Sequence, residues 1–112
     1  MAITYEGKVI ETTGTGFLQD QTDWSEGLAG HMAGQEGIAL GERHWDLIHY
    51  LRAEYFENAQ NQPNTRAIVK AMSDKWGAKV SQRDLYELFP GDPSKQAGRI
   101  AGLPESRRKG GY

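Results

Sequence analysis

The chain has 112 residues, a net charge of −2 at pH 7 and no cysteine. Its length fits one domain with a single core, and no apolar run approaches the ~18 residues that a membrane span needs. The lack of cysteine excludes disulfides, thiolate metal sites, cysteine nucleophiles and a persulfide carried on this chain. Because the N-terminal stretch lacks the basic flank and apolar block of a signal peptide, we expect a cytoplasmic protein.

Charge divides unevenly along the chain. Residues 1–63 hold ten acidic residues and three lysines or arginines, for a net charge of −7. Residues 64–112 hold five acidic and ten basic residues, for a net charge of +5. The second half is therefore a candidate anion-facing surface for nucleic acid or an acidic protein. Small domains also segregate charge by chance, and the pattern alone leaves both explanations open.

The N-terminal residues predict a small β-hairpin. Residues 3–11 alternate polar and apolar side chains around Glu6 and Gly7, and the turn-rich stretch TTGTG follows them. We expect a further short strand at Phe17 and Leu18. Strands this short are marginal alone, so the hairpin must rest on helices.

Two helices are predicted next. Asp23 is the predicted N-cap of the first helix, which runs to Glu36 and stops at Gly37. The second spans residues 42–58, where apolar side chains recur at helical spacing. These side chains are Trp45, Ile48, Leu51 and Tyr55, flanked by Leu47 and Phe56. A helix of this length extends roughly 25 Å, enough to cross the domain, so we expect it at the centre of the core.

Residues 65–89 have the outline of a helix-turn-helix. One helix begins at an Asn64-Thr65 cap and stops at Gly77, and a shorter one begins at a Ser81 cap. In helix-turn-helix proteins the second helix meets base edges, while nearby cations meet phosphates. The candidate nucleic-acid-binding residues are Arg66, Lys70, Lys79, Gln82 and Arg83. The same outline is an ordinary corner in helical bundles, so DNA binding is one alternative.

The last predicted helix begins at Asp92-Pro93 and breaks at Gly102. The final residues, ESRRKGGY, offer little apolar surface to bury. We therefore expect a single domain of residues 1–104, followed by a flexible arm of residues 105–112.

No motif supplies a catalytic or metal centre. His44 and His49 are about 140° apart on a helix, so they do not share a face as a His-x-x-x-His zinc pair would. The sequence lacks a G-x-S-x-G motif and the glycine-rich phosphate-binding motifs. We therefore expect a protein that is not an enzyme and has no metal, no cofactor and no small-molecule substrate.

Several strings, in order and with matching spacing, are similar to one family. They are DW at residue 23, EGIAL at 36, HWDLIHYLRAEY at 44, PNTRAIVKA at 63, LYELFPGDPSKQA at 85 and RIAGLP at 99. The chain resembles the DsrC/TusE sulfur-relay family over about residues 14–104. Members of this family are also called the gamma subunit of dissimilatory sulfite reductase.

The resemblance implies a mainly α fold: a small orthogonal helical bundle with an N-terminal β-hairpin, a helix-turn-helix-like element and a flexible C-terminal arm. In this family the arm carries a penultimate cysteine, which accepts sulfur as a persulfide and presents it in a partner's active site. TusE-type members pass sulfur from a TusBCD-like complex towards tRNA 2-thiolation. DsrC-type members have a second cysteine just before the RIAGLP-like string and work with sulfite reductase. The chemistry needs a thiolate.

The sequence departs from the family at both cysteine positions. Gly98 precedes RIAGLP, Gly111 is penultimate, and the tail is longer than the usual family tail. Glycine cannot hold sulfane sulfur, so the resemblance implies the fold but not the relay chemistry. A natural cysteine-less paralogue, an engineered variant and a paralogue with a new activity all fit. The altered tail favours the natural paralogue.

Two functions from different classes follow. The first is a binding or regulatory protein that docks on a sulfur-relay or sulfite-reductase partner, or that regulates genes through DNA. In the docking version, Arg107, Arg108 and Lys109 steer the arm, and Tyr112 makes an aromatic end contact. The second is a structural component of a sulfur-transfer assembly in which another chain carries the sulfur. A retained fold without a sulfur role stays open.

Overall fold

The computed structural model describes residues 2–104. Its described elements are two strands, one 3₁₀ turn and five α-helices. In chain order they are β1 (Ala2–Tyr5), β2 (Lys8–Glu11), the 3₁₀ turn (Gln21–Asp23), α1 (Glu26–Gln35), α2 (Glu42–Glu57), α3 (Thr65–Trp76), α4 (Gln82–Leu88) and α5 (Pro93–Ile100). The predicted mainly α fold with an N-terminal hairpin is confirmed. The predicted arm lies outside the described residues, so the division at residue 104 stays a prediction.

The hairpin forms where the sequence predicts it. β1 and β2 pair antiparallel, and Glu6 and Gly7 both have positive φ, as a two-residue hairpin turn favours. The further strand expected at Phe17 and Leu18 is reduced to one bridge between Leu18 and Thr12. Local backbone hydrogen bonds close this stretch into a compact loop, which leaves no length for a longer ladder.

The N-cap predicted at Asp23 is wrong. Asp23 ends the 3₁₀ turn, Trp24 has extended backbone angles, and the Ser25 hydroxyl caps α1. Trp24 thus stands outside the helix, and its indole N–H donates to the backbone oxygen of Ile100 at 2.8 Å. The predicted end is confirmed, since Gly37 follows α1 with a φ of 77°.

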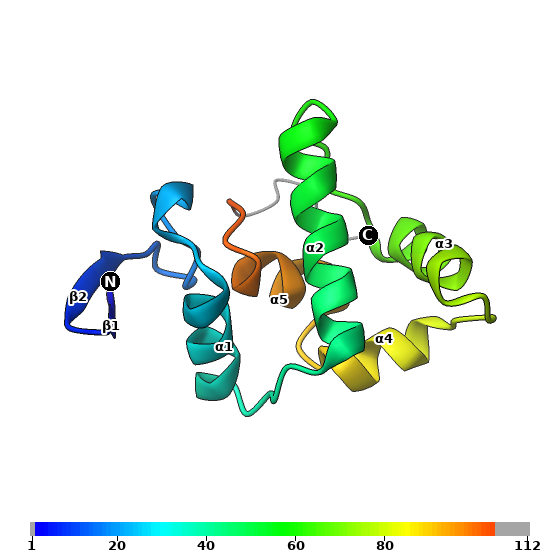
Figure 1. Ribbon diagram of the computed structural model, residues 1–112, viewed down its shortest axis with the longest axis horizontal. Coiled ribbons are helices and arrows are strands. Elements are labelled where there is room, and N and C mark those ends of the chain that lie inside the picture. Colours follow the sequence, from blue (N-terminus) through cyan, green and yellow to red (C-terminus); the bar gives the residue numbers. More distant parts are fainter. Residues whose placement is uncertain (1, 105–112) are drawn as a thin grey trace.

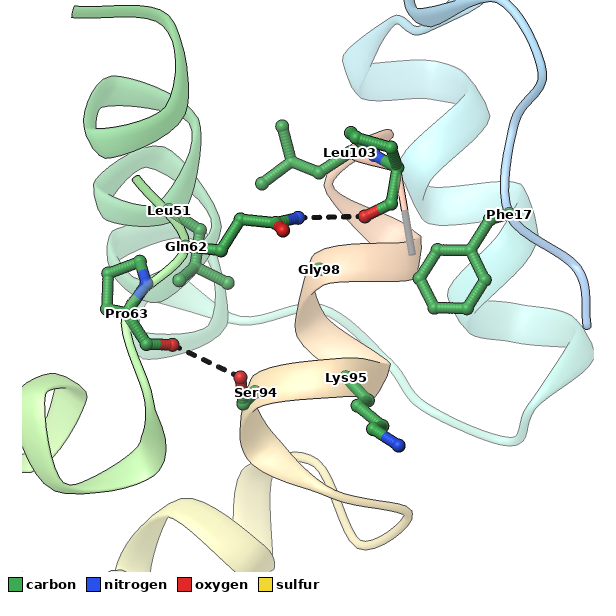
Figure 2. Close-up of a pocket in the computed structure, with 9 residues that line it drawn as sticks. Phe17, Leu51, Gln62, Pro63, Ser94, Lys95, Gly98 and Leu103 are labelled. Atoms are coloured by element: carbon green, nitrogen blue, oxygen red, sulfur yellow. Dashed lines mark hydrogen bonds between the residues drawn. The ribbon is translucent and has the colours of Figure 1, made fainter. Parts of the chain in front are cut away.

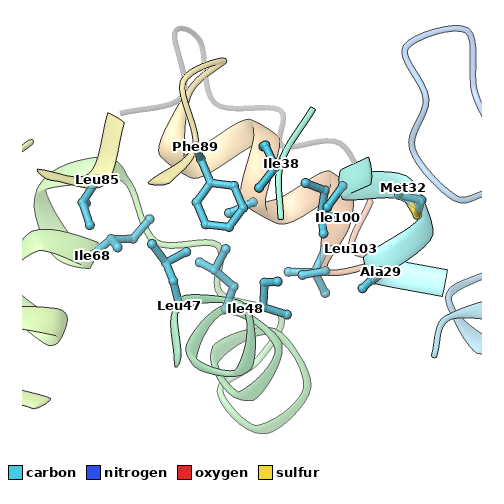
Figure 3. Packing of buried hydrophobic residues seen from close by; sticks show 14 of the residues in the cluster. Ala29, Met32, Ile38, Leu47, Ile48, Ile68, Leu85, Phe89, Ile100 and Leu103 are labelled. Atoms are coloured by element: carbon cyan, nitrogen blue, oxygen red, sulfur yellow. The ribbon is translucent and has the colours of Figure 1, made fainter. Parts of the chain in front are cut away.

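α2 is the central helix, as predicted. It lies across the middle of the molecule, with α1 and α5 on one side and α3 on the other (Figure 1). Leu47, Ile48 and Leu51 of α2 are almost fully buried. They belong to one core with side chains from the other helices and from the C-terminal end, among them Met32, Ile68, Leu85, Phe89, Ile100 and Leu103 (Figure 3). Each buried side chain of this size contributes ~1.5–3 kcal/mol of transfer free energy.

α3 and α4 form the predicted helix-turn-helix-like element. The Asn64 side chain caps α3 by accepting from a backbone N–H of its first turn, and Gly77 ends α3 in the left-handed conformation. At the start of α4, Ser81 and Asp84 cap each other's backbone N–H groups. The three caps predicted at Asn64, Gly77 and Ser81 are therefore confirmed.

α5 ends the described fold. The Asp92 side chain caps its start, Pro93 is its first residue, and Gly102 follows its end with a φ of 77°. These boundaries confirm the predicted last helix. In the described part of the chain, no helix has both the length and the apolar character that a bilayer crossing requires.

Candidate functional site

Residues 100–104, which we call the arm root, are held by side chains from distant parts of the chain. Three backbone oxygens of the arm root each accept a hydrogen bond from one such side chain. The donors are the indole of Trp24 to Ile100 (2.8 Å), the guanidinium of Arg52 to Ala101 (2.7 Å) and the amide of Gln62 to Pro104 (2.8 Å, Figure 2). Because the last carbonyls of a helix lack partners within the helix, the bonds to Ile100 and Ala101 satisfy the end of α5, and all three bonds fix the path of the arm root.

Arg52 also stacks on two aromatic rings. Its guanidinium carbon lies 3.8 Å from the centre of the Trp24 ring and 4.8 Å from that of Phe56. A cation over an aromatic face gains ~0.5–2 kcal/mol, more when water is excluded. Partial burial removes water from the guanidinium and lowers the pKa of Arg52. The stack therefore orients the donor that holds Ala101.

Gly102 allows Trp24 to approach the arm root closely. A Cβ added at Gly102 would lie 2.3 Å from Cδ1 of Trp24, closer than two carbon atoms can pack. The positive φ of Gly102 also disfavours other residues. Glycine at this position is thus required both by the backbone conformation and by the indole against it.

Gly98 lies beside a small hollow next to the arm root. The hollow has about 290 Å³ of space, open solvent included, and is lined in part by Leu51, Gln62, Gly98, Leu103 and Pro104 (Figure 2). Gly98 is buried, but an added Cβ there would have no atom within 4 Å apart from its chain neighbours and the backbone of its own helix. The position that the family resemblance assigns to the second cysteine therefore has room for a side chain, although this chain provides none.

The five candidate nucleic-acid-binding residues are all exposed, and they lie on α3, α4 and the connection between them. Two of them, Arg66 and Gln82, line one hollow together with Tyr86. Arg83 instead faces Glu87 of its own helix at 3.9 Å. Lys70 and Lys79 do not line the hollow that Arg66 and Gln82 share. The structure thus brings two of the five residues together.

The described histidines make separate contacts. Nδ1 of His44 accepts from the backbone N–H of Gly41, and its Nε2 is bonded to the backbone oxygen of Leu88, both at 3.0 Å. His49 faces Glu26 at 3.3 Å. Within residues 2–104, no three His, Asp or Glu side chains are grouped as metal ligands would be.

The predicted docking residues Arg107, Arg108, Lys109 and Tyr112, together with Gly111, lie outside the described residues, and their roles stay predictions. Sequence reasoning missed the three side chains that hold the arm root. They are separated from their partners by 76, 49 and 42 residues. No local pattern joins positions so far apart, and the string DW drew attention to Trp24 only through the family resemblance.

The comparisons with known proteins agree with this fold. The family model described as DsrC like protein matches residues 4–108, which include Gly98 and the arm root and end before Gly111. The chain is 46% identical over 104 residues to the sulfurtransferase TusE of Yersinia pestis, a match that covers 92% of this chain and 94% of the relative.

Solved structures give the same result. The NMR structure of DsrC from Allochromatium vinosum is 41% identical with a TM-score of 0.83, and the match covers 96% of this chain and 98% of that one. The crystal structure of the oxidized gamma subunit of dissimilatory sulfite reductase from Archaeoglobus fulgidus is 33% identical with a TM-score of 0.87, at the same coverage. The chain therefore belongs to the DsrC-like family of sulfur-relay proteins.

Proposed function

We propose that this chain is a non-catalytic member of the DsrC-like family that binds a sulfur-relay or sulfite-reductase partner without carrying sulfur. The observation that carries the proposal is a family fold combined with a sequence that has no cysteine. In persulfide transfer the thiolate is both the nucleophile and the sulfur carrier. Because the chain provides no thiolate, its contribution is binding.

The arm root supports a binding role. Its three backbone oxygens are held by Trp24, Arg52 and Gln62, so the described fold ends at a fixed point, at Pro104. A fixed starting point reduces the ordering entropy that a docking segment loses on binding. The three consecutive cations from Arg107 to Lys109 would then steer the segment towards an acidic groove.

The relatives suggest the class of partner. One is named a sulfurtransferase and another is named a subunit of dissimilatory sulfite reductase. By extension from these two names, we propose that the partner of this chain is a TusBCD-type relay complex or a sulfite reductase. A chain that occupies the docking site without delivering sulfur would lower sulfur flux through that partner, which is a regulatory effect by competition.

Two measurements on the purified chain test the proposal. Titration calorimetry with a purified TusBCD-type complex, and with a sulfite reductase depleted of its gamma subunit, should detect binding to one of them. A variant truncated after residue 104 should bind that partner at least tenfold more weakly, since charged and aromatic contacts would be lost. Intact mass after incubation with a sulfur-loaded TusE should show no added sulfur. Absence of binding to both assemblies would reject the proposal.

DNA binding through the helix-turn-helix-like element stays a prediction. The observation in its favour is the hollow shared by Arg66 and Gln82, whereas the relatives described above are named for sulfur transfer and sulfite reduction. Mobility shifts measured across a salt series decide the question, because phosphate contacts are strongest at low salt. If the chain shifts no DNA at low salt, it does not bind DNA through this element.

A structural role in a sulfur-transfer assembly also stays a prediction. In that case the chain would co-purify with the assembly at fixed stoichiometry and would not exchange with a cysteine-bearing relative. Displacement by such a relative would distinguish a competitor from a permanent component.

A further inference from the structure

The three side chains of the Arg52 stack also line a second hollow, and two of them contact the arm root. This hollow has about 530 Å³ of open space. Its wall includes Trp24, Glu26, His49, Arg52, Phe56 and Glu57. We propose that this hollow, with Phe56 as its main contact, is the surface on which the partner protein rests when it binds the arm. The inference rests on the proposed function and names the part of the folded body that the partner covers.

Phe56 differs from the other exposed apolar side chains. Within the described residues, the large apolar side chains that are exposed are Val9, Phe56 and Tyr86, at 62%, 52% and 40%. The Phe56 ring is supported by Arg52, which in turn stacks on Trp24 and bonds to Ala101. A side chain ordered in this way loses less entropy when a partner covers it. Aromatic and arginine side chains also dominate the binding energy of protein interfaces.

The length of the chain beyond Pro104 keeps the partner close. An extended chain spans at most ~3.3–3.6 Å per residue, so Arg107 can lie no more than roughly 11 Å along the chain from Pro104. A protein that holds the cations of the arm is therefore within a few side-chain lengths of the arm root. Trp24 and Arg52 contact the arm root and also line the hollow. The hollow thus continues the surface that such a partner must approach.

Charge indicates the chemistry of the partner. Glu26 and Glu57 are exposed at the hollow, and Glu26 has a side-chain exposure of 68%. Even with the Arg52 guanidinium in the same wall and His49 facing Glu26, the two exposed carboxylates leave the wall net acidic, which repels nucleic acid and favours a basic group. The arm itself has three consecutive cations that favour an acidic groove. The partner that fits is a protein with an acidic groove for the arm and, next to it, an apolar side chain and a basic group for the hollow.

Substitutions at the hollow test the inference against the partner assembly that binds the unsubstituted chain in calorimetry. Phe56→Ala should weaken binding at least tenfold, the loss expected for a central contact. Glu57→Lys should also weaken it and lower the association rate, because it reverses a charge that steers the partner. The second variant removes no contact with Arg52, and a cation at the C-terminal end of α2 is compatible with the helix dipole, so folding is preserved.

Val9→Ala and Tyr86→Ala are the matched controls, because they remove exposed apolar side chains from the hairpin and from α4. Both should bind within about twofold of the unsubstituted chain, as expected for residues outside an interface. If Phe56→Ala and Glu57→Lys bind as tightly as the unsubstituted chain, the inference is wrong while the proposed function stands. If Tyr86→Ala alone weakens binding, the partner rests on the helix-turn-helix-like element and the inference is wrong. An unsubstituted chain that binds neither assembly would overturn both proposals.

Discussion

The guanidinium of Arg52 lies 3.8 Å from the centre of the Trp24 ring, and the two side chains donate to adjacent backbone oxygens, those of Ala101 and Ile100. This pair joins the segment before α1, the middle of α2 and the end of α5. It places the start of the C-terminal residues at one point on the body. That placement does not depend on a cysteine, as the proposed binding role requires.

Arg52→Ala should destabilise the fold by about 2 kcal/mol. The change leaves the Ala101 oxygen without its donor, which costs ~1–3 kcal/mol when the group is shielded from water, and it removes the stacking on Trp24. Urea unfolding followed by tryptophan fluorescence measures the change.

Arg52→Lys is the informative companion. A lysine keeps the charge but has no planar group that can stack on two rings and donate at the same time, so it should recover less than half of the loss. Arg83→Ala is the control, because Arg83 is 89% exposed, and such surface substitutions cost roughly 0.5 kcal/mol or less. If Arg52→Lys is as stable as the unsubstituted chain, the stack does not hold the arm root.

Alanine substitutions at Gly98 of α5 and at Gly102 of the arm root should change the stability of the fold in opposite directions. Gly98→Ala places a Cβ in free space inside α5 and should stabilise the fold by up to ~1 kcal/mol through helix propensity. Gly102→Ala places a Cβ against the Trp24 ring at positive φ and should destabilise it by ~2–4 kcal/mol. Thermal unfolding of the two variants compares them directly, and equal effects would contradict the packing described for Trp24.

The cap of α4 should respond to acid. The Asp84 carboxylate accepts from the backbone N–H of Ser81 at 2.9 Å, and this hydrogen bond lowers the pKa of Asp84 below its ordinary value of 3.8. A carboxyl whose pKa is lower in the folded state stabilises that state above the unfolded pKa, and the contribution is lost as pH falls through the folded pKa.

The Ser81 amide resonance should therefore move as pH falls below about 4. NMR titration measures this, and Asp84→Asn should abolish the response at Ser81. A Ser81 amide that titrates unchanged in Asp84→Asn would show that another group governs the cap.

Local signals in the sequence predicted most of the helices. Asn64, Gly77 and Ser81 are caps and stops whose chemistry acts within four residues, and the apolar spacing of α2 identified the central helix. The error at Asp23 has a tertiary cause. The residue type of Asp23 and its place before an expected helix favour it as a cap, but the hydrogen bond from Trp24 to Ile100 keeps Trp24 out of the helix.

The candidate site was less predictable for the same reason. Gly98 was identified through the family resemblance, and the structure adds that its position has room for a side chain. The arm root is held by hydrogen bonds from Trp24, Arg52 and Gln62, whose partners lie more than 40 residues away in the sequence. The residues next to these three in the sequence do not indicate such contacts. The predicted DNA-binding residues were chosen from a helix-turn-helix outline, which specifies a backbone path and not a ligand.

Competition for the partner tests whether this chain binds the same assembly as its cysteine-bearing relatives without carrying sulfur. A fluorescently labelled, cysteine-bearing TusE is bound to its TusBCD-type complex, or a labelled DsrC to its sulfite reductase, and this chain is added in increasing amounts. We expect the chain to displace the label from one of these assemblies while its intact mass shows no bound sulfur. The proposed function would be contradicted if the label stayed bound in both assemblies at saturating concentrations of the chain, or if sulfur were found on the chain.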